Sequence, residues 1–177
     1  PLWMPGTTAV VLRRAEGSPA PGWSSAWLDP REVEVLCVRR ADNGAWTPVT
    51  GIVDPGEEPA VAAARFPAPS TFAQDLPGVA YSAIGQEETA VVARPTRLLS
   101  VEVVGPVTYV NGDVTTYLDV AFACEWAEGR PEPADGENTE ARFVRADRLP
   151  PMNARFTRAI ARALSGEPSA VFLTEPV

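Results

Sequence analysis

The first forty residues contain two apolar runs typical of β-strands. Residues 7–14 are rich in β-branched side chains, and residues 32–40 alternate between polar and apolar positions. Each pattern predicts a strand. The segment between them is rich in glycine, proline and serine, so we expect an extended hairpin loop. Trp23 and Trp27 lie in this loop, and we expect both to fold back onto the domain.

A turn, a short strand and the start of a helix follow. Asn43 and Gly44 favour the turn, which leads into a strand at residues 46–50. A second turn after Gly51 opens an alanine-rich segment with the character of a helix. We expect this helix to stop before Pro67, because proline removes a backbone donor and clashes with the previous helical turn.

The strongest strand predictions fall at residues 97–105 and 114–126, which are rich in β-branched and aromatic side chains. Asn111, Gly112 and Asp113 predict the turn of the hairpin that joins them. The segment 127–138 is polar and contains two prolines, so we expect a loop there.

The C-terminal part predicts one strand and one helix. Residues 139–150 have the pattern of a strand and its exit, and residues 152–166 have helical apolar spacing that ends at Gly166. We expect the arginines of this helix on a solvated face. Strands, an interrupted helix, more strands and a terminal helix together predict an α+β sandwich with a mixed β-sheet.

The length and composition favour one domain over residues 1–177, with insertions at about 15–31 and 66–83. The hydrophobic content of 45% is ordinary for a folded protein, and 19 prolines indicate long irregular connections. No stretch approaches the roughly 20 apolar residues that span a bilayer. The first residues also lack the pattern of a secretory signal. We therefore expect a cytoplasmic protein with no membrane partner.

The charged and reactive residues narrow the chemistry. A net charge of -8 argues against a protein that grips nucleic acid, although nucleotides as small ligands stay compatible through a bound cation. The chain has no histidine, which excludes histidine triads, histidine general bases and histidine-rich zinc sites. It has no lysine either, so its side-chain cations are arginines. Cys37 and Cys124 fall in strand-like runs and are expected to be buried free thiols.

Acidic side chains gather in three places that could contribute to a cation site. Mg²⁺ prefers oxygen ligands, so two or three convergent carboxylates would suffice. Taken singly, each cluster is more typical of a solvated surface. The clusters are Glu57 with Glu58, Glu87 with Glu88, and the loop acids Asp135, Glu137 and Glu140.

The spacing of residues 51–65, "GIVDPGEEPAVAAAR", changes the weight of these acids. The segment resembles the first two thirds of the Nudix box, G-x5-E-x7-R-E-U-x-E-E-x-G-U, in which U is aliphatic. Five residues separate Gly51 from Glu57, and seven separate Glu57 from Arg65. The flanking segments resemble bacterial Nudix hydrolases in the same order, over about residues 7–164. The resemblance implies an α/β/α sandwich with a mixed sheet.

The box is interrupted after its arginine. Positions 69 and 70, where the family has paired glutamates, hold Pro69 and Ser70, and a glutamate pair appears only at Glu87 and Glu88. The glutamate expected next to the arginine has no match, because Phe66 stands there. The pair can still dock in the usual place if the segment around it forms a short helical turn. Otherwise Glu87 and Glu88 are surface acids.

The resemblance implies roles for individual residues. Glu87 and Glu88 would bind Mg²⁺, with Mn²⁺ as an alternative, helped by a backbone carbonyl at Thr50 or Gly51. Glu57 belongs to the same metal region and would pair with Arg65 to brace the loop and helix.

A general base could come from outside the box, at Glu137 or Glu140. Trp46 and Tyr109 could stack on a base, but we expect both to belong to the core, where strand and loop aromatics more often lie.

The implied activity is hydrolysis of a phosphorus-containing acid anhydride. The substrate would be a small nucleotide, a nucleoside diphosphate linked to another group, cleaved at its pyrophosphate bond with Mg²⁺. A homodimer is a candidate assembly. The alternative is a Nudix-fold nucleotide-binding or regulatory module with impaired catalysis, suggested by the interrupted box, because a fold alone does not establish activity.

Overall fold

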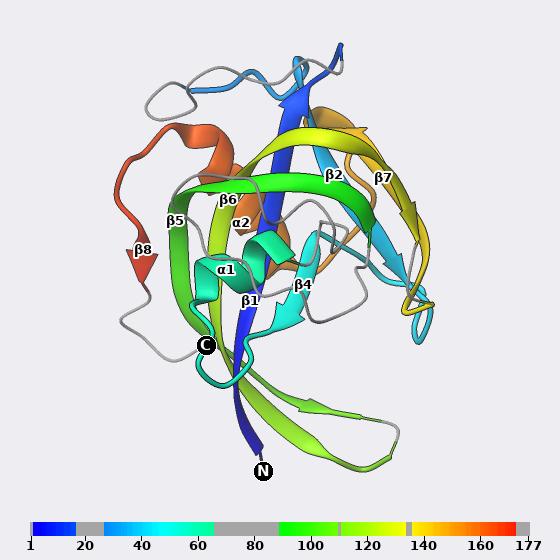
Figure 1. The fold of residues 1–177 in the computed structure, drawn as a ribbon, viewed down its shortest axis with the longest axis vertical. Coiled ribbons are helices and arrows are strands. Elements are labelled where there is room, and N and C mark those ends of the chain that lie inside the picture. Colours follow the sequence, from blue (N-terminus) through cyan, green and yellow to red (C-terminus); the bar gives the residue numbers. More distant parts are fainter. Residues whose placement is uncertain (1, 17–26, 66–88, 110, 134–135, 173–177) are drawn as a thin grey trace.

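The computed structural model describes residues 2–16, 27–65, 89–109, 111–133 and 136–172. Eight strands form one sheet with the order β3-β2-β1-β6-β5-β8, while β4 pairs with β1 and β7 with β2 (Figure 1). The strands are β1 Leu2–Arg14, β2 Val33–Arg40, β3 Trp46–Thr47, β4 Val49–Ile52, β5 Thr89–Thr108, β6 Val114–Pro133, β7 Asn138–Arg145 and β8 Val171–Phe172. The helices are α1 Pro59–Arg65, the 3-10 helix η1 Ala146–Arg148 and α2 Ala154–Ser165.

Strand β1 lies in the middle of the sheet and is buried on both faces. Ala9 and Val11 belong to the core cluster beneath α1, whereas Val10 and Leu12 belong to the cluster beneath α2. A strand covered on both faces is apolar at successive positions, which explains the continuous apolar run in this part of the sequence. The two helices lie on opposite faces (Figure 1). The predicted α+β, α/β/α sandwich is therefore confirmed.

The sheet is mixed because β1 runs parallel to β6 and antiparallel to β2 and β4. Leu2 pairs with Thr115, and the ladder continues to Leu12 opposite Glu125. This pairing extends β1 five residues before the predicted start at residue 7. The extension contains a proline and a glycine, so its strand conformation depends on its partner rather than on local propensity.

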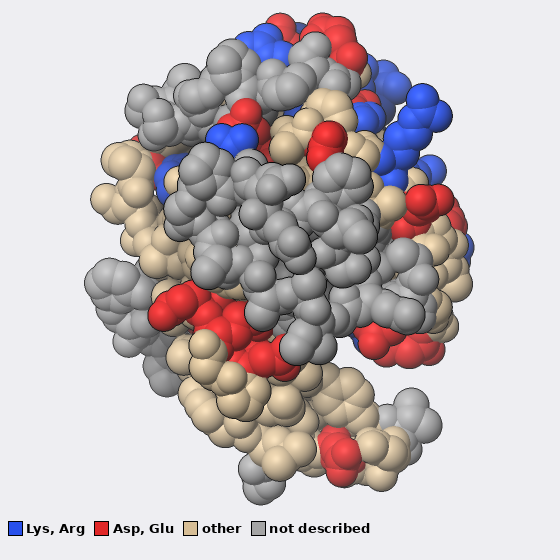
Figure 2. Space-filling model, viewed as in Figure 1, with Lys and Arg blue, Asp and Glu red and all other residues tan. Residues whose placement is uncertain are grey.

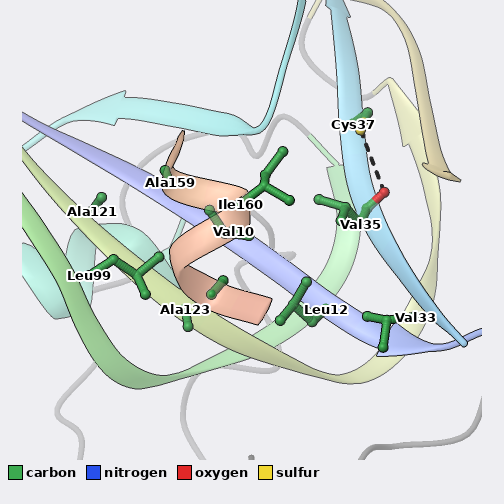
Figure 3. Packing of buried hydrophobic residues seen from close by; sticks show 11 residues of the cluster. Val10, Leu12, Val33, Val35, Cys37, Leu99, Ala121, Ala123, Ala159 and Ile160 are labelled. Carbon is green, nitrogen blue, oxygen red and sulfur yellow. Dashed lines mark hydrogen bonds between the residues drawn. The ribbon is translucent and has the colours of Figure 1, made fainter. Parts of the chain in front are cut away.

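Helix α2 packs through a narrow apolar stripe of two alanines and two larger side chains. Phe156, Ala159, Ile160 and Ala163 are buried, and Figure 3 shows Ala159 and Ile160 against the side chains of the sheet. The Asn153 side chain accepts a hydrogen bond from the backbone N–H of Arg155 at the start of the helix. Gly166 ends it in the left-handed conformation, as predicted.

Strands β5 and β6 form a long hairpin whose length the sequence did not predict. The turn lies at Asn111–Asp113 as expected, with Gly112 at positive φ. Residues 127–133, expected to be a loop, instead continue β6 and pair with the start of β5. Gly129 makes this possible: its φ is +92°, and a Cβ there would lie 2.1 Å from the carbonyl oxygen of Ala90. A bulge tolerates the prolines of this polar segment.

Other predictions have mixed outcomes. Trp27 is 66% exposed, so the expectation that it folds back onto the domain is wrong. Trp23 and the whole of the proposed insertion at 66–83 lie outside the described residues. Cys37 and Cys124 are buried free thiols, as predicted; burial raises the pKa of Cys37 to about 12 and also raises that of Cys124. No described helix is long and apolar enough to cross a membrane.

Candidate functional site

A cavity of about 850 Å³ opens at one end of the sheet. Five parts of the chain surround it: the paired strands β1 and β4 with the loop after β4, the turn from β2 to β3, the hairpin of β5 and β6, the segment before β7, and the start of α2. In Figure 2 the hairpin projects from the body of the molecule, and acidic side chains gather on the body above it. The volume lies within the range of small-molecule sites.

The box-like segment begins on the wall of this cavity. Gly51 lies in β4 opposite Thr7 of β1, and both residues line the cavity. The chain then turns through Gly56, whose φ of +86° favours glycine, and enters α1 at Pro59. Ala62, Ala63 and Ala64 bury α1 against the sheet, so small side chains fix the helix close to β1 and β5.

Glu57 closes the turn before α1. Its carboxylate accepts a hydrogen bond from the backbone N–H of Asp54 at 3.1 Å, and its own N–H donates to the carbonyl of Asp54 at 3.0 Å. These reciprocal bonds position the loop between β4 and α1. Arg65 is the last residue of α1, but its side chain lies outside the described part, so the predicted pair of Glu57 and Arg65 stays a prediction.

The two candidates for a general base lie in different surroundings. Glu137 lines the cavity, and its backbone carbonyl accepts a hydrogen bond from Ala41 at 2.8 Å. Glu140 lies in β7, pairs with Arg39 at 3.1 Å and does not line the cavity. The geometry thus favours Glu137 over Glu140 for contact with a ligand.

The predicted metal ligands Glu87 and Glu88 lie outside the described residues. Among the residues that are described, no three histidine, cysteine, aspartate or glutamate side chains form a group that could hold a metal ion. Gly51 and Glu57, also predicted for the metal region, do lie at the edge of the cavity and in the loop that follows it. They do not provide a carboxylate cluster by themselves, and the binding of a cation by Glu87 and Glu88 stays a prediction.

One buried polar group at the cavity, Asp119, was not predicted from the sequence. Asp119 of β6 accepts hydrogen bonds from the Thr8 hydroxyl at 3.0 and 2.9 Å, and Arg155 of α2 lies 3.4 Å from its carboxylate. Burial raises the pKa of Asp119, against the opposing effects of Arg155 and Thr8. The sequence does contain a signal for this site, a single aspartate inside the apolar strand 114–126. Buried acids are rare without partners, so an acid at such a position indicates a polar contact.

Aromatic residues border the cavity on two sides. Trp46 is half-buried against the core, as expected, and it also lines the cavity. Tyr109 is 39% exposed and not part of the core, contrary to expectation. Its hydroxyl is hydrogen-bonded to that of Tyr117, and burial together with this bond raises the pKa of Tyr117 to about 12.

The described wall of the cavity has more acids than bases. The acids are Asp42, Asp54, Asp119 and Glu137, and the bases are Arg40 and Arg155. Arg40 is joined to Asp42 by two hydrogen bonds of 2.9 Å, which offset its charge. An anionic ligand would meet an unfavourable field here unless a cation accompanied it.

Comparison with known proteins supports the fold but not a close relationship. No family model and no curated protein matches the chain in sequence. Among solved structures, the chain is similar to the MutT protein from Methanosarcina mazei Go1, with a TM-score of 0.55 and 15% identity over 92% of this chain and 93% of that one. It is also similar to a Nudix hydrolase from Nitrosomonas europaea, with a TM-score of 0.54 and 16% identity over 96% and 77%.

A third similar structure is a UDP-X diphosphatase, with a TM-score of 0.52 and 16% identity. The match covers 92% of this chain but spans only 61% of the length of that protein. Identities this low show the fold alone. The chain has the fold of the Nudix hydrolases, as the resemblance of its box-like segment implied.

Proposed function

We propose that this chain, with its Nudix fold, is a hydrolase that cleaves the pyrophosphate bond of a nucleoside diphosphate-linked substrate and depends on Mg²⁺, with Mn²⁺ as an alternative. The observation that carries the proposal is the position of the box-like segment, because Gly51 lines a cavity of about 850 Å³. The fold is shared with proteins named MutT and Nudix hydrolase, which supports a hydrolase, and with one named UDP-X diphosphatase, whose name is compatible with the proposed substrate.

The charge of the cavity supports a role for a cation. Four acids and two arginines line its described wall, and one of those arginines is paired with an acid. A bare diphosphate would be repelled by this surface. A bound divalent cation would neutralise the diphosphate and lower the pKa of a water molecule.

The residues of the chain have separate tasks in this proposal. Glu87 and Glu88 hold the cation, an assignment that rests on their sequence pattern. Glu57 holds the loop before α1 through its bonds to Asp54. Glu137, on the cavity wall, accepts the proton of the attacking water.

The second candidate is a nucleotide-binding module without efficient hydrolysis. Phe66 occupies the position next to the box arginine where the family has a glutamate, and the expected glutamate pair is displaced to Glu87 and Glu88. This departure removes a residue that the family uses as a metal ligand or base, while the cavity itself is preserved.

Hydrolysis by the purified chain tests the proposal. A panel of nucleoside triphosphates and nucleoside diphosphate-linked compounds is incubated with Mg²⁺, with Mn²⁺ or with a chelator. We expect product release only with a cation, and at least about a hundredfold loss in the variant with both Glu87→Gln and Glu88→Gln. Glu167→Gln, an exposed position after α2, is the matched control. Binding without turnover in every condition would instead support the module.

A further inference from the structure

The guanidinium of Arg155 has N–H donors that make no hydrogen bond within the described part of the chain. It lies at the start of α2, lines the cavity, and has a side chain that is 25% exposed. A guanidinium carries five N–H donors. In the described part of the chain, one of them makes a hydrogen bond, to Asp119 at the long distance of 3.4 Å. The guanidinium carbon also lies 3.9 Å from the ring centroid of Phe156, which holds the group in place.

Other arginines of the chain are used more fully. Arg40 binds Asp42 through two hydrogen bonds of 2.9 Å, and Arg145 binds Asp147 through bonds of 3.0 and 2.6 Å. These are the two-bonded forks that arginine usually forms with a carboxylate. Arg155 forms no such fork with Asp119, so its donors stay available at the cavity wall.

Asp119 supplies acceptors beside these donors. The Thr8 hydroxyl, with one hydrogen to donate, lies 3.0 and 2.9 Å from its two oxygens and holds the carboxylate in place. A carboxylate has about four acceptor positions, so this contact and the long one from Arg155 do not fill them. The wall therefore presents donors and acceptors side by side, both on rigid elements of the fold.

Arg155 and Asp119 together suit a neutral ligand group better than an anion. Asp119 is the register partner of Glu102. Burial lowers the pKa of Arg155, and both acids oppose this shift. Asp119 offsets Arg155, whereas Glu102 is paired with Arg162 and Arg158, so the charge that an incoming group meets beside Arg155 is the carboxylate of Asp119. A further phosphate or carboxylate would be disfavoured, whereas a neutral donor and acceptor edge could bond to both residues.

Asp119, the partner of Arg155, also lies next to the box-like segment, residues 51–65. A Cβ on Gly6 would be 3.6 Å from both the Asp119 carboxylate and the Gly51 carbonyl. The glycine leaves open the space between these two oxygens. A ligand with its diphosphate near Gly51 could reach Asp119 and Arg155 with its other end, and Trp46 on the cavity wall offers a flat apolar surface.

We propose that Arg155 and Asp119 recognise the nucleobase of the substrate through an edge that has an N–H donor beside an acceptor. Arg155 donates to the acceptor, and Asp119 accepts from the N–H. The inference rests on the proposed function for the direction of the ligand, because the diphosphate is taken to lie at Gly51. It makes these two residues determinants of specificity rather than catalytic residues.

Binding of uncharged nucleosides to the full chain tests this without any metal or turnover. Adenosine, guanosine, cytidine, uridine and ribose are titrated at pH 8 by calorimetry and ligand-observed NMR. We expect at least one nucleoside to bind and ribose not to. Arg155→Met, which keeps the length of the side chain, is expected to weaken that binding at least about tenfold, the effect of removing hydrogen bonds to a charged group. Arg31→Met, at an exposed pair with Asp29, is the control.

Asp119→Asn gives an independent reading, because it keeps the shape and the acceptor for Thr8 but adds an N–H donor. We expect it to change the order of preference among the four nucleosides, which a purely structural role would not do. Arg155→Lys keeps the charge if the methionine variant does not fold, and is expected to lose affinity as well.

Several outcomes would overturn the inference. These are no nucleoside binding by the natural chain, unchanged affinities in the folded variants, or an equal loss in Arg155→Met of the binding of inorganic pyrophosphate, measured separately with Mg²⁺ present. Nucleoside binding that depends on Arg155, combined with no hydrolysis of any substrate, would contradict the proposed function alone.

Discussion

Glu102 of β5 and Asp119 of β6 lie opposite each other in the sheet, and arginines of α2 reach both carboxylates. Arg162 lies 2.5 Å from Glu102, and Arg158 lies 3.7 Å from it. The expectation of a solvated arginine face on this helix holds for Arg158, whose side chain is 46% exposed, but is wrong for Arg155 and Arg162. The helix is attached to the sheet by buried ion pairs along one side and by an apolar stripe along another.

Removing one partner of the tightest pair should destabilise the fold. In Arg162→Met, the carboxylate of Glu102, which is only 9% exposed, loses its closest cation. We expect the free energy of unfolding to fall by about 3 kcal/mol, the low end for buried pairs that lose one member, because Arg158 stays 3.7 Å from Glu102. Urea unfolding measures this. Adding Glu102→Gln should restore part of the loss, and a double variant no more stable than the single one would contradict the prediction.

The stability of the fold should depend on pH through Asp119. Burial raises its pKa from 3.8, so the native state holds this proton more tightly than the unfolded chain does. The favourable contribution is therefore present below about pH 4 and is lost as pH rises through the raised value. As the pH rises over this window, the melting temperature of the natural chain should fall relative to that of Asp119→Asn.

Melting curves of both proteins from pH 3.5 to 8 provide the measurement. The lowered pKa values of Asp29, Asp42 and Asp147 act in the opposite direction, but they are common to both proteins and cancel in the difference. A difference in melting temperature that stays constant over the range would show that Asp119 is not the cause.

Gly129 should tolerate no side chain. In Gly129→Ala, the new Cβ would lie 2.1 Å from the carbonyl oxygen of Ala90 and the residue would keep a φ of +92°. We expect a loss of about 2 kcal/mol or more from strain and displacement of β5. Gly112→Ala is the matched control, because it has a similar φ of +88° but open space around it. Equal losses in the two variants would mean that backbone conformation alone matters.

Filling the space at Gly6 tests the cavity without changing a polar group. A Cβ there makes contacts of ordinary length, so Gly6→Ala should fold and bind nearly normally. The larger Gly6→Val should keep the strand, since valine is favourable in sheets, but should weaken ligand binding at least about tenfold by occupying the cavity. Isothermal titration with the best nucleoside compares the two. Full affinity in a folded Gly6→Val protein would show that ligands bind elsewhere.

The choice between the two candidate bases can be tested by matched substitutions. Glu137→Gln should reduce kcat about a hundredfold or more, the contribution typical of general base catalysis, because Glu137 lines the cavity. Glu140→Gln should change kcat less than twofold, because that side chain is paired with Arg39 outside the cavity. Steady-state kinetics on the best substrate of the panel decides between them, and a larger effect at Glu140 would reverse the assignment.

Much of the fold was predictable because local signals agreed with tertiary structure. Gly166 marked the end of α2, and the turn at Asn111–Asp113 marked the hairpin. The misses came from pairing between distant segments. Residues 127–133 look like a loop by composition, but β5 pairs with them, and Gly129 provides the conformation that the bulge needs.

The candidate site was less predictable for the same reason. Spacing located Gly51 and Glu57, which are close in sequence and lie in β4 and in the loop that joins it to α1. Asp119, Thr8 and Arg155 come from three different elements. Thr8 and Asp119 are 111 residues apart in sequence, Asp119 and Arg155 are 36 apart, and no local pattern links them. An aspartate inside an apolar strand was the available signal, and its partners could be identified only once β1, β6 and α2 were placed together.

The parallel ladder between β1 and β6 has a consequence for how the molecule is built. Thr7 bonds to Val120 across 113 residues of sequence, and the whole ladder joins segments about equally distant. Closing so large a loop is entropically costly, so refolding should be slow for a chain of this size. Until β6 arrives, the apolar strand at the centre of the core has no partner on that side. The interval before closure is therefore when the chain is most exposed to self-association, and when a chaperone would have most to protect.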